Sequence, residues 1–332
     1  KNFSKPFFLL VLLNAEIFQV FARYQMSNTD ANAANNENKV NNDDNKECND
    51  DDPVITLHPK SRIINYPNSK QQRLKVPDDK VSWNVKWPQY DPPFYTAKHV
   101  LNGKGPDPKL ADAKTLKWNQ LDGKVNRVSH MGKYKIVNGI PQNPNGRTGL
   151  LGRGHLWRWG PNHAADPIVT RFKRDNDNNI IKDETSGKNI LEFVAIMRTD
   201  GGGYAIPGGM IEPGDTLSRT LKKEFGEEAM NSLEMNENET KKMYQSLKEL
   251  FDIQGKYAIK VYAGYCDDPR NTDNSWMETV AYNFHDKNGD ITNKFKLKAG
   301  DDACAVQWMS INKDIKLYAS HEDFIKKVAI IH

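Results

Sequence analysis

Cysteine is scarce in this chain, and this scarcity limits the kinds of site it can build. The 332 residues include three cysteines, Cys48, Cys266 and Cys304, and none of them belongs to a CxxC pair. An odd number at wide spacing excludes a zinc ribbon and a disulfide framework. We therefore expect free, buried thiols, with a Cys266–Cys304 disulfide as an alternative if the protein is secreted.

Long apolar runs are also rare. The apolar run at residues 7–13 follows Lys1 and Lys5 and ends at Asn14. It is too short to predict a transmembrane helix. Small residues near 20–22 resemble a cleavage site, and the pattern predicts a signal peptide over residues 1–25. We expect a secretory or extracellular protein with no membrane span in its mature chain. A mitochondrial presequence is the alternative, although Arg23 is the sole arginine among the first 60 residues.

Residues 26–60 lack the apolar side chains that a folded core needs. Nine Asn and six Asp crowd positions 27–52, where the net charge is −6. Such a composition cannot offset the entropy lost on folding, so we expect a disordered spacer. The rest of the chain is mildly basic, which suits a small anionic substrate and is too weak a charge for a nucleic-acid partner.

Residues 61–165 are expected to form a smaller, irregular N-terminal domain. Aromatic residues alternate with prolines between 83 and 95, which favours packed loops over long helices. Residues 121–140 carry turn signals at both ends and predict a hairpin. The Gly-rich stretch 146–154 contains Arg147, a candidate phosphate ligand. Glycines for tight turns and an arginine for surface ion pairs are the alternative.

Residues 166–332 show strands and helices in alternation. The pattern predicts strands at 191–197, 204–207, 257–265, 277–284 and 306–309, with helices at 241–251 and 321–331. Together with a helix that starts near residue 216, these elements predict an α/β domain with helices on both faces of a mixed sheet.

The stretch 208–228 contains the candidate catalytic and metal-binding residues. After a Pro-Gly turn, Asp215 or Thr216 can cap a helix whose apolar stripe is Leu217, Leu221 and Phe225. Three acids, Glu224, Glu227 and Glu228, share one sector of that helix at spacings of three and four residues.

This acidic sector is electrostatically unfavourable without a cation. Two carboxylates about 5 Å apart repel by roughly 3 kcal/mol at an effective dielectric near 20, and acids late in a helix oppose its dipole. Oxygen ligands without Cys or His suit Mg²⁺, with Mn²⁺ also possible. A solvated acidic face is the alternative.

The stretch resembles the Nudix box, G-x5-E-x7-R-E-U-x-E-E-x-G-U. Gly209 stands at the first Gly, Glu224-Phe225 at the E-U pair and Glu227-Glu228 at the E-E pair. Several positions differ from the box, among them Asp215 in place of Glu, Lys223 in place of Arg and Met230 in place of the last Gly. Lys223 keeps a charge that can orient a carboxylate, but it lacks the bidentate fork of Arg.

Further strings extend the resemblance over residues 62–330. They are 146–149, 160–167, 267–274 with Trp276, 300–303 and 317–321. Together they resemble the mitochondrial-type ADP-ribose pyrophosphatases of the Nudix superfamily, and also the ADP-ribose-sensing module of melastatin-type TRP channels. The resemblance implies a Nudix α/β/α sandwich in a monomer, and Mg²⁺-dependent hydrolysis of ADP-ribose to AMP and ribose 5-phosphate. A sensor that does not cleave ADP-ribose, or a hydrolase of another nucleoside diphosphate, are the alternatives.

The same resemblance implies roles for individual residues. The metal ligands would be Gly208, Glu224, Glu227, Glu228 and an acid outside the box, Asp302 or its neighbour Asp301. Glu224 would act as the base beside Lys223, Glu227 and Glu228. The substrate would contact Arg147, Arg270, Tyr318 and His321, although a core tyrosine and a surface arginine are the alternatives for two of them.

Overall fold

The structure, a computed structural model, describes residues 57–312, 315–318 and 320–332. The predicted leader (1–25) and most of the predicted spacer (26–60) lie outside the described residues. The described residues belong to one compact unit. The division predicted at residue 165 stays a prediction, and strand β7 (Gly160–Phe172) runs through that position without a break.

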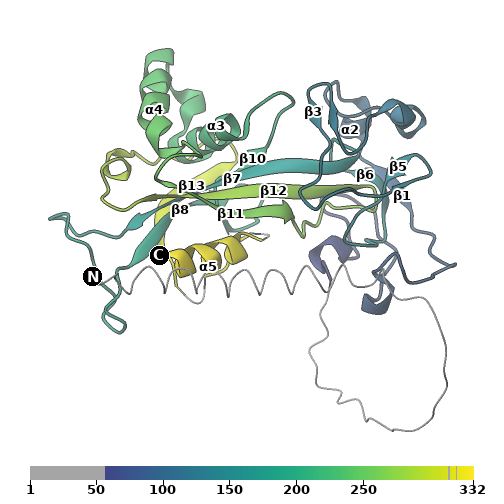
Figure 1. The fold of residues 1–332 in the computed structure, drawn as a ribbon, viewed down its shortest axis with the longest axis horizontal. Coiled ribbons are helices and arrows are strands. Elements are labelled where there is room, and N and C mark those ends of the chain that lie inside the picture. The colour runs from purple at the N-terminus through teal and green to yellow at the C-terminus, as the bar shows by residue number, and fades with distance from the viewer. Residues whose placement is uncertain (1–56, 313–314, 319) are drawn as a thin grey trace, which may run out of the picture. The chain divides into compact units, whose positions relative to one another are not determined.

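A seven-stranded mixed sheet forms the centre of the molecule, which confirms the α/β class (Figure 1). Its main order is β11-β12-β7-β8-β13, and β10 pairs with β7 while β9 pairs with β8. The pairing of β7 with β12 is parallel, and the other pairings are antiparallel. The remaining strands are β8 (Leu191–Arg198), β9 (Tyr204–Ala205), β10 (Gly209–Met210), β11 (Ala258–Tyr265), β12 (Ser275–Asp286) and β13 (Ala303–Ser310).

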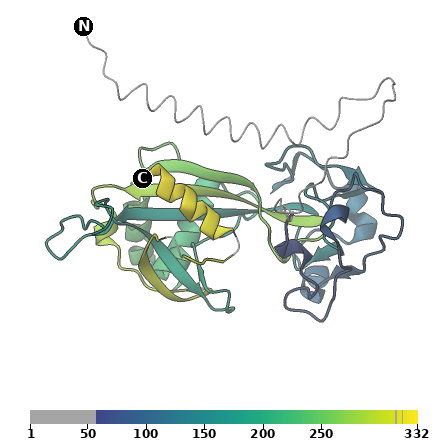
Figure 2. The same ribbon diagram turned by 90° about the horizontal axis from the view of Figure 1, so that it is seen from below.

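Helices cover both faces of this sheet. Helices α3 (Leu217–Met230) and α4 (Glu237–Leu250) lie on one face, where Leu221, Phe225 and Phe251 pack against strand residues. Helix α5 (His321–Ile331) lies across the other face, where its Phe324 and Ile325 pack on Ile168 (Figure 2). The layered arrangement predicted from the alternation of elements is therefore confirmed, and among the described residues no helix has the length and apolarity that a membrane crossing needs.

Strand β7 was not predicted, although it is the longest strand of the sheet. Its sequence, GPNHAADPIVTRF, contains Gly, Pro, Asn and Asp, which are typical of turns. Small and branched side chains nevertheless suit a strand between two neighbours: Ala165, Ile168 and Val169 are fully buried. The pairing with β12, more than 100 residues away, decides the conformation here.

The N-terminal part of the described chain is irregular, as predicted, and is built from short elements. These are η2 (Lys60–Arg62), η3 (Asp78–Lys80), β1 (Phe94–Thr96), α2 (Lys98–Asn102), η4 (Leu110–Thr115), β2 (Leu121–Asp122), β3 (Val125–Asn126), β4 (Ile136–Val137), β5 (Ile140–Pro141) and β6 (Leu151–Gly154). The single hairpin predicted over 121–140 was wrong. Two separate two-residue hairpins form, each closing at its own Gly with positive φ, Gly123 and Gly139.

The loop between β11 and β12 attaches this irregular part to the sheet. Asp267 accepts a hydrogen bond from the Ser61 hydroxyl at 2.7 Å, and buried Asp273 accepts one from the Thr148 hydroxyl at 2.8 Å. The expectation of buried thiols holds for one of the two described cysteines: Cys266 is partly buried, Cys304 is exposed, and both are free, so no disulfide joins them.

Candidate functional site

The start of α3 is built as the sequence predicts. Gly214 takes a positive φ of 90° in the turn, and the Thr216 side chain accepts a hydrogen bond from the backbone N–H of Arg219. Leu221 and Phe225 are fully buried and hold the helix on the sheet. Their burial fixes which side of α3 faces the sheet. The acids next to them on the helix are therefore drawn toward the interior as well.

Two of the three predicted acids are buried. Glu224 is 9% exposed and Glu228 is 5% exposed, whereas Glu227 lies at an intermediate position. Burial raises the pKa of Glu224 to about 7 and the pKa of Glu228 to about 8, and it also raises the pKa of Glu227. Removal from water disfavours the charged form of each carboxyl, and a nearby positive charge would favour it.

The Gly208-Gly209 backbone lies directly against these carboxylates. The N–H of Gly208 donates to Glu228 Oε2 at 2.9 Å. A Cβ on Gly209 would lie 2.3 Å from Glu224 Oε2, and a Cβ on Gly208 would lie 2.2 Å from Asp166 Oδ1. Neither glycine has a positive φ, so close approach, and not backbone conformation, is what requires glycine here.

These features fit a hard divalent cation. Buried carboxylate oxygens with raised pKa values, beside a peptide that no side chain shields, form an oxygen-only donor set. The three carboxylates do not form a tight cage by themselves, since their oxygens are not all within 4.8 Å of one another. Backbone oxygens and substrate oxygens would have to complete such a site, as is usual for Mg²⁺.

Lys223 lies at the edge of the acidic group. Its Nζ is 2.6 Å from Glu212 Oε1, and its charge lowers the pKa values of Glu224 and Glu227 against the effect of burial. The lysine therefore acts on the acids as a nearby point charge, and Glu212 fixes its position.

The charge of Asp301 acts on the acidic group. The charge of Asp301 contributes to the raised pKa values of Glu224, Glu227 and Glu228, whereas no such effect comes from Asp302. The contact of Asp302 is a backbone one: its carbonyl accepts the Thr199 N–H at 2.9 Å. Asp301 takes a positive φ of 49° in the turn before β13. The predicted metal contact of Asp302, or of its neighbour Asp301, stays a prediction.

A second group of side chains brings together three predicted substrate residues, Arg270, Tyr318 and His321. Arg270 makes a bidentate ion pair with Asp268, at 2.8 Å from Nε and 2.7 Å from a terminal nitrogen. Burial alone would raise the pKa of Asp268, but the Arg270 guanidinium outweighs it and holds that pKa below its ordinary value. The Arg270 side chain stays 37% exposed, so its outer edge can meet an anion.

Tyr318 and His321 flank this pair. The two rings meet edge to face at 6.0 Å, and the charge of Arg270 acts on the Tyr318 hydroxyl. Burial lowers the pKa of His321 to about 3, so the ring is neutral. Its Nδ1 accepts the Ile206 N–H at 3.0 Å, which leaves the proton on Nε2, 3.9 Å from Asp166.

Two residues of this region had no predicted role. Arg198 lies over the Tyr318 ring at 4.4 Å and also lowers the pKa of Glu228, so it links the two groups. Asp166 is buried beside Gly208 and accepts from the Thr279 hydroxyl at 2.6 Å, and burial raises its pKa to about 6. The sequence offered one weak signal for Arg198, which directly follows the predicted strand 191–197, and none for Asp166, which lies in a turn-like stretch.

Arg147 makes structural contacts within the N-terminal part of the chain. Its guanidinium donates to the backbone carbonyls of Lys80, Ser82 and Val85, at 2.6 to 3.0 Å, and lies over the Trp83 ring at 4.8 Å. Both terminal nitrogens of Arg147 make these hydrogen bonds, so the side chain holds the N-terminal loops together. The predicted contact of Arg147 with the substrate stays a prediction.

Comparisons with known proteins show which chains this one is similar to. The profile of the family described as NUDT9-like, N-terminal domain matches residues 76–160. The mitochondrial ADP-ribose pyrophosphatase of Rattus norvegicus is 53% identical over 82% of this chain and 77% of its own length. Putative nudix hydrolase 6 of Caenorhabditis elegans is 48% identical over 81% of this chain and 95% of its own length.

Longer proteins contain a similar stretch. A transient receptor potential channel of subfamily M from Nematostella vectensis is 49% identical over 82% of this chain, which spans 18% of that channel. Among solved structures, the NUDIX domain of Shewanella oneidensis NrtR with ADP ribose aligns with a TM-score of 0.34 and 12% identity. That alignment covers 52% of this chain and 88% of the other.

Proposed function

Because this chain belongs to the Nudix hydrolase family, in the branch of the mitochondrial ADP-ribose pyrophosphatases, we propose that it hydrolyses the pyrophosphate bond of ADP-ribose. The products are AMP and ribose 5-phosphate. The observation that carries the proposal is the burial of Glu224 and Glu228 against the bare Gly208-Gly209 peptide.

The residues that would hold a divalent cation, with Mg²⁺ proposed as the natural one, are Glu224, Glu227, Glu228 and the carbonyl of Gly208. When bound, such a cation neutralises the anionic oxygens of a diphosphate and makes a bound water more acidic. Asp301 adds negative charge at the edge of the same group, which favours cation binding.

The chain's own residues supply the remaining functions. Once it is ionised, the Glu224 carboxylate can accept a proton from the attacking water. Arg270 and Arg198 place two guanidinium groups beside Tyr318, where they can bind the negative charge of the substrate. The Tyr318 ring offers a stacking surface for a nucleoside, and His321, held by the Ile206 N–H, supplies a neutral N–H donor.

The direct test uses the full chain with Mg²⁺ and a panel of substrates: ADP-ribose, NADH and a sugar nucleotide, with products separated by chromatography. We expect rapid release of AMP from ADP-ribose and at least about tenfold less turnover of the others. Binding of ADP-ribose without AMP release would favour a sensor module. Preferred cleavage of NADH would assign the site to another nucleoside diphosphate.

The affinity for divalent cations should rise steeply between pH 6 and pH 8. A cation binds the ionised carboxylates, and the pKa values of Glu224 and Glu228 are about 7 and about 8. Protons therefore compete below these values, and up to two are displaced on binding, so affinity changes by up to roughly a hundredfold per pH unit at the acidic end. Titration calorimetry with Mn²⁺ in buffers of different ionisation enthalpy measures both the affinity and the protons released.

The matched control for this pH dependence is Glu228→Gln, which should release about one proton fewer. An affinity that stays constant from pH 6 to pH 8 would contradict the proposed metal ligands.

We propose the mitochondrion, the alternative given by the sequence, as the compartment, because the rat relative is named mitochondrial. A fusion of residues 1–60 to a fluorescent protein tests this directly. Import into mitochondria is expected, and glycosylation at Asn238 of the full chain would contradict it.

A further inference from the structure

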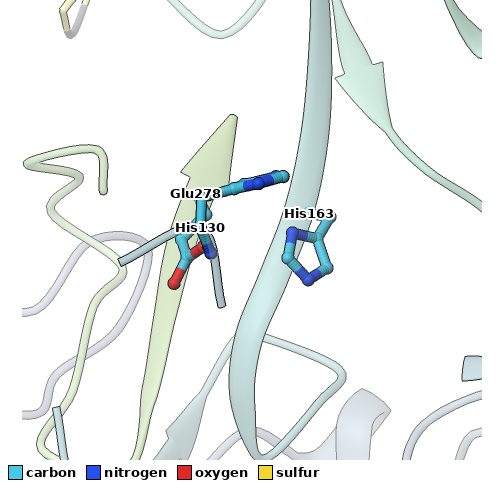
Figure 3. A group of neighbouring side chains, drawn as sticks. All are labelled: His130, His163 and Glu278. Carbon is cyan, nitrogen blue, oxygen red and sulfur yellow. The ribbon is translucent and has the colours of Figure 1, made fainter. Parts of the chain in front are cut away.

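Three side chains outside the proposed active site converge at one end of the sheet (Figure 3). His163 lies on β7 and Glu278 lies opposite it on β12, as partners in the parallel pairing. His130 comes from the loop between β3 and β4. The potential ligand atoms of the three residues all lie within 4.8 Å of one another, and the two imidazole rings meet at 5.1 Å.

Glu278 is fully buried and rigidly oriented. Its Oε1 accepts from the Ser129 hydroxyl at 2.6 Å and from Trp276 Nε1 at 2.7 Å, and its Oε2 accepts from the His130 N–H at 2.7 Å. Neutral donors surround this carboxylate, and no Lys or Arg forms an ion pair with it among the described residues. Three of about four acceptor positions are used, so one stays available.

His163 provides the second observation. Both of its ring nitrogens are buried and have no hydrogen-bond partner in the described part of the chain, although the Val128 carbonyl lies near the ring. An unpartnered polar atom in the interior costs free energy, so native structures rarely keep one without a purpose. Burial lowers the pKa values of both His130 and His163.

We propose that His130, His163 and Glu278 bind a transition-metal ion of borderline softness, such as Zn²⁺. Two imidazole nitrogens and one carboxylate oxygen form a three-ligand set that suits zinc, whereas Mg²⁺ prefers oxygen alone. His130 is exposed, so an ion can enter from solvent and keep a fourth position open. The bound ion would tie the loop that carries His130 to strands β7 and β12.

The site is distinct from the carboxylates of α3. Its ligands come from a loop and two strands, and none of them belongs to α3 or to the Gly208-Gly209 peptide. The two sites are connected through the backbone, because the His163 carbonyl accepts a hydrogen bond from the N–H of Ile211, just after the Gly208-Gly209 peptide. They have no ligand in common. A zinc ion here would act on the stability of the fold and not on the diphosphate.

The experiment uses the full chain, stripped of metal by a chelator and then titrated with Zn²⁺ in excess Mg²⁺. Wild type should bind one equivalent, and its thermal midpoint should rise by several degrees. His130→Asn should weaken zinc binding by at least about tenfold and remove the thermal shift. The matched control is His99→Asn, another exposed histidine, which should bind zinc as wild type does.

Glu228→Gln separates the two sites. We expect this variant to keep the zinc equivalent while it loses hydrolysis, and Co²⁺ bound in place of zinc should show absorption bands that His130→Asn lacks. Equal zinc affinity in wild type and His130→Asn would overturn the proposal. Loss of zinc in Glu228→Gln alone would move the ion to the carboxylates and would overturn it as well.

Discussion

Replacing Glu224 by Gln is expected to lower the rate of ADP-ribose hydrolysis by about 10³-fold while ADP-ribose still binds. A positioned general base contributes roughly 10²- to 10⁴-fold, and an amide of the same shape cannot accept the proton. The side chain is buried between α3 and Gly209, so the amide should occupy the same place. Steady-state AMP release and equilibrium binding of ADP-ribose measure the two effects separately.

The same substitution should stabilise the metal-free protein at pH 8. The folded pKa of Glu224, about 7, lies above the ordinary 4.5, so stability is lost as pH rises from about 4.5 toward 7 and the buried carboxyl ionises. A neutral amide removes a penalty of up to about 3 kcal/mol. Glu249→Gln, an exposed acid on α4, is the matched control and should change neither property. Unchanged AMP release by Glu224→Gln would remove this residue from the chemistry.

Gly209→Ala is expected to reduce kcat/KM by about 10²-fold with the fold retained. The added Cβ would lie 2.3 Å from Glu224 Oε2, so the carboxylate must move away from its position. Displacing a catalytic group by about 1 Å is enough for an effect of this size. The atom that must move is the end of a flexible side chain, so the loss of stability should be small.

Gly201→Ala controls for the methyl group itself. Nothing lies within 4 Å of a Cβ at Gly201, so this variant should keep its activity, although its positive φ of 80° costs some stability. Wild-type kcat/KM in Gly209→Ala would show that the glycine–carboxylate contact has no catalytic importance. An equal loss in both variants would point to a general effect of loop substitution.

Local sequence was sufficient for the elements whose patterns are short-ranged. The cap at Thr216, the stripe of Leu221 and Phe225 and the acid spacing predicted α3 and its acidic sector, because a helix is specified by residues three and four apart. The pattern of apolar residues likewise predicted α5 and most strands of the sheet. The raised pKa values of Glu224 and Glu228 follow from this, since the stripe that buries α3 also buries them.

Tertiary structure alone decided the rest. Strand β7 carries turn-like residues and exists because β12 pairs with it, so Asp166 beside Gly208, and His163 beside Glu278, could not be inferred from either segment. Folding likewise turned Arg147 toward backbone carbonyls. The physical reason is the distance in sequence between interacting residues. Side chains that share a helix face are three or four residues apart, so the local sequence shows the pattern, whereas paired strands can be more than 100 residues apart and neither strand's sequence identifies its partner.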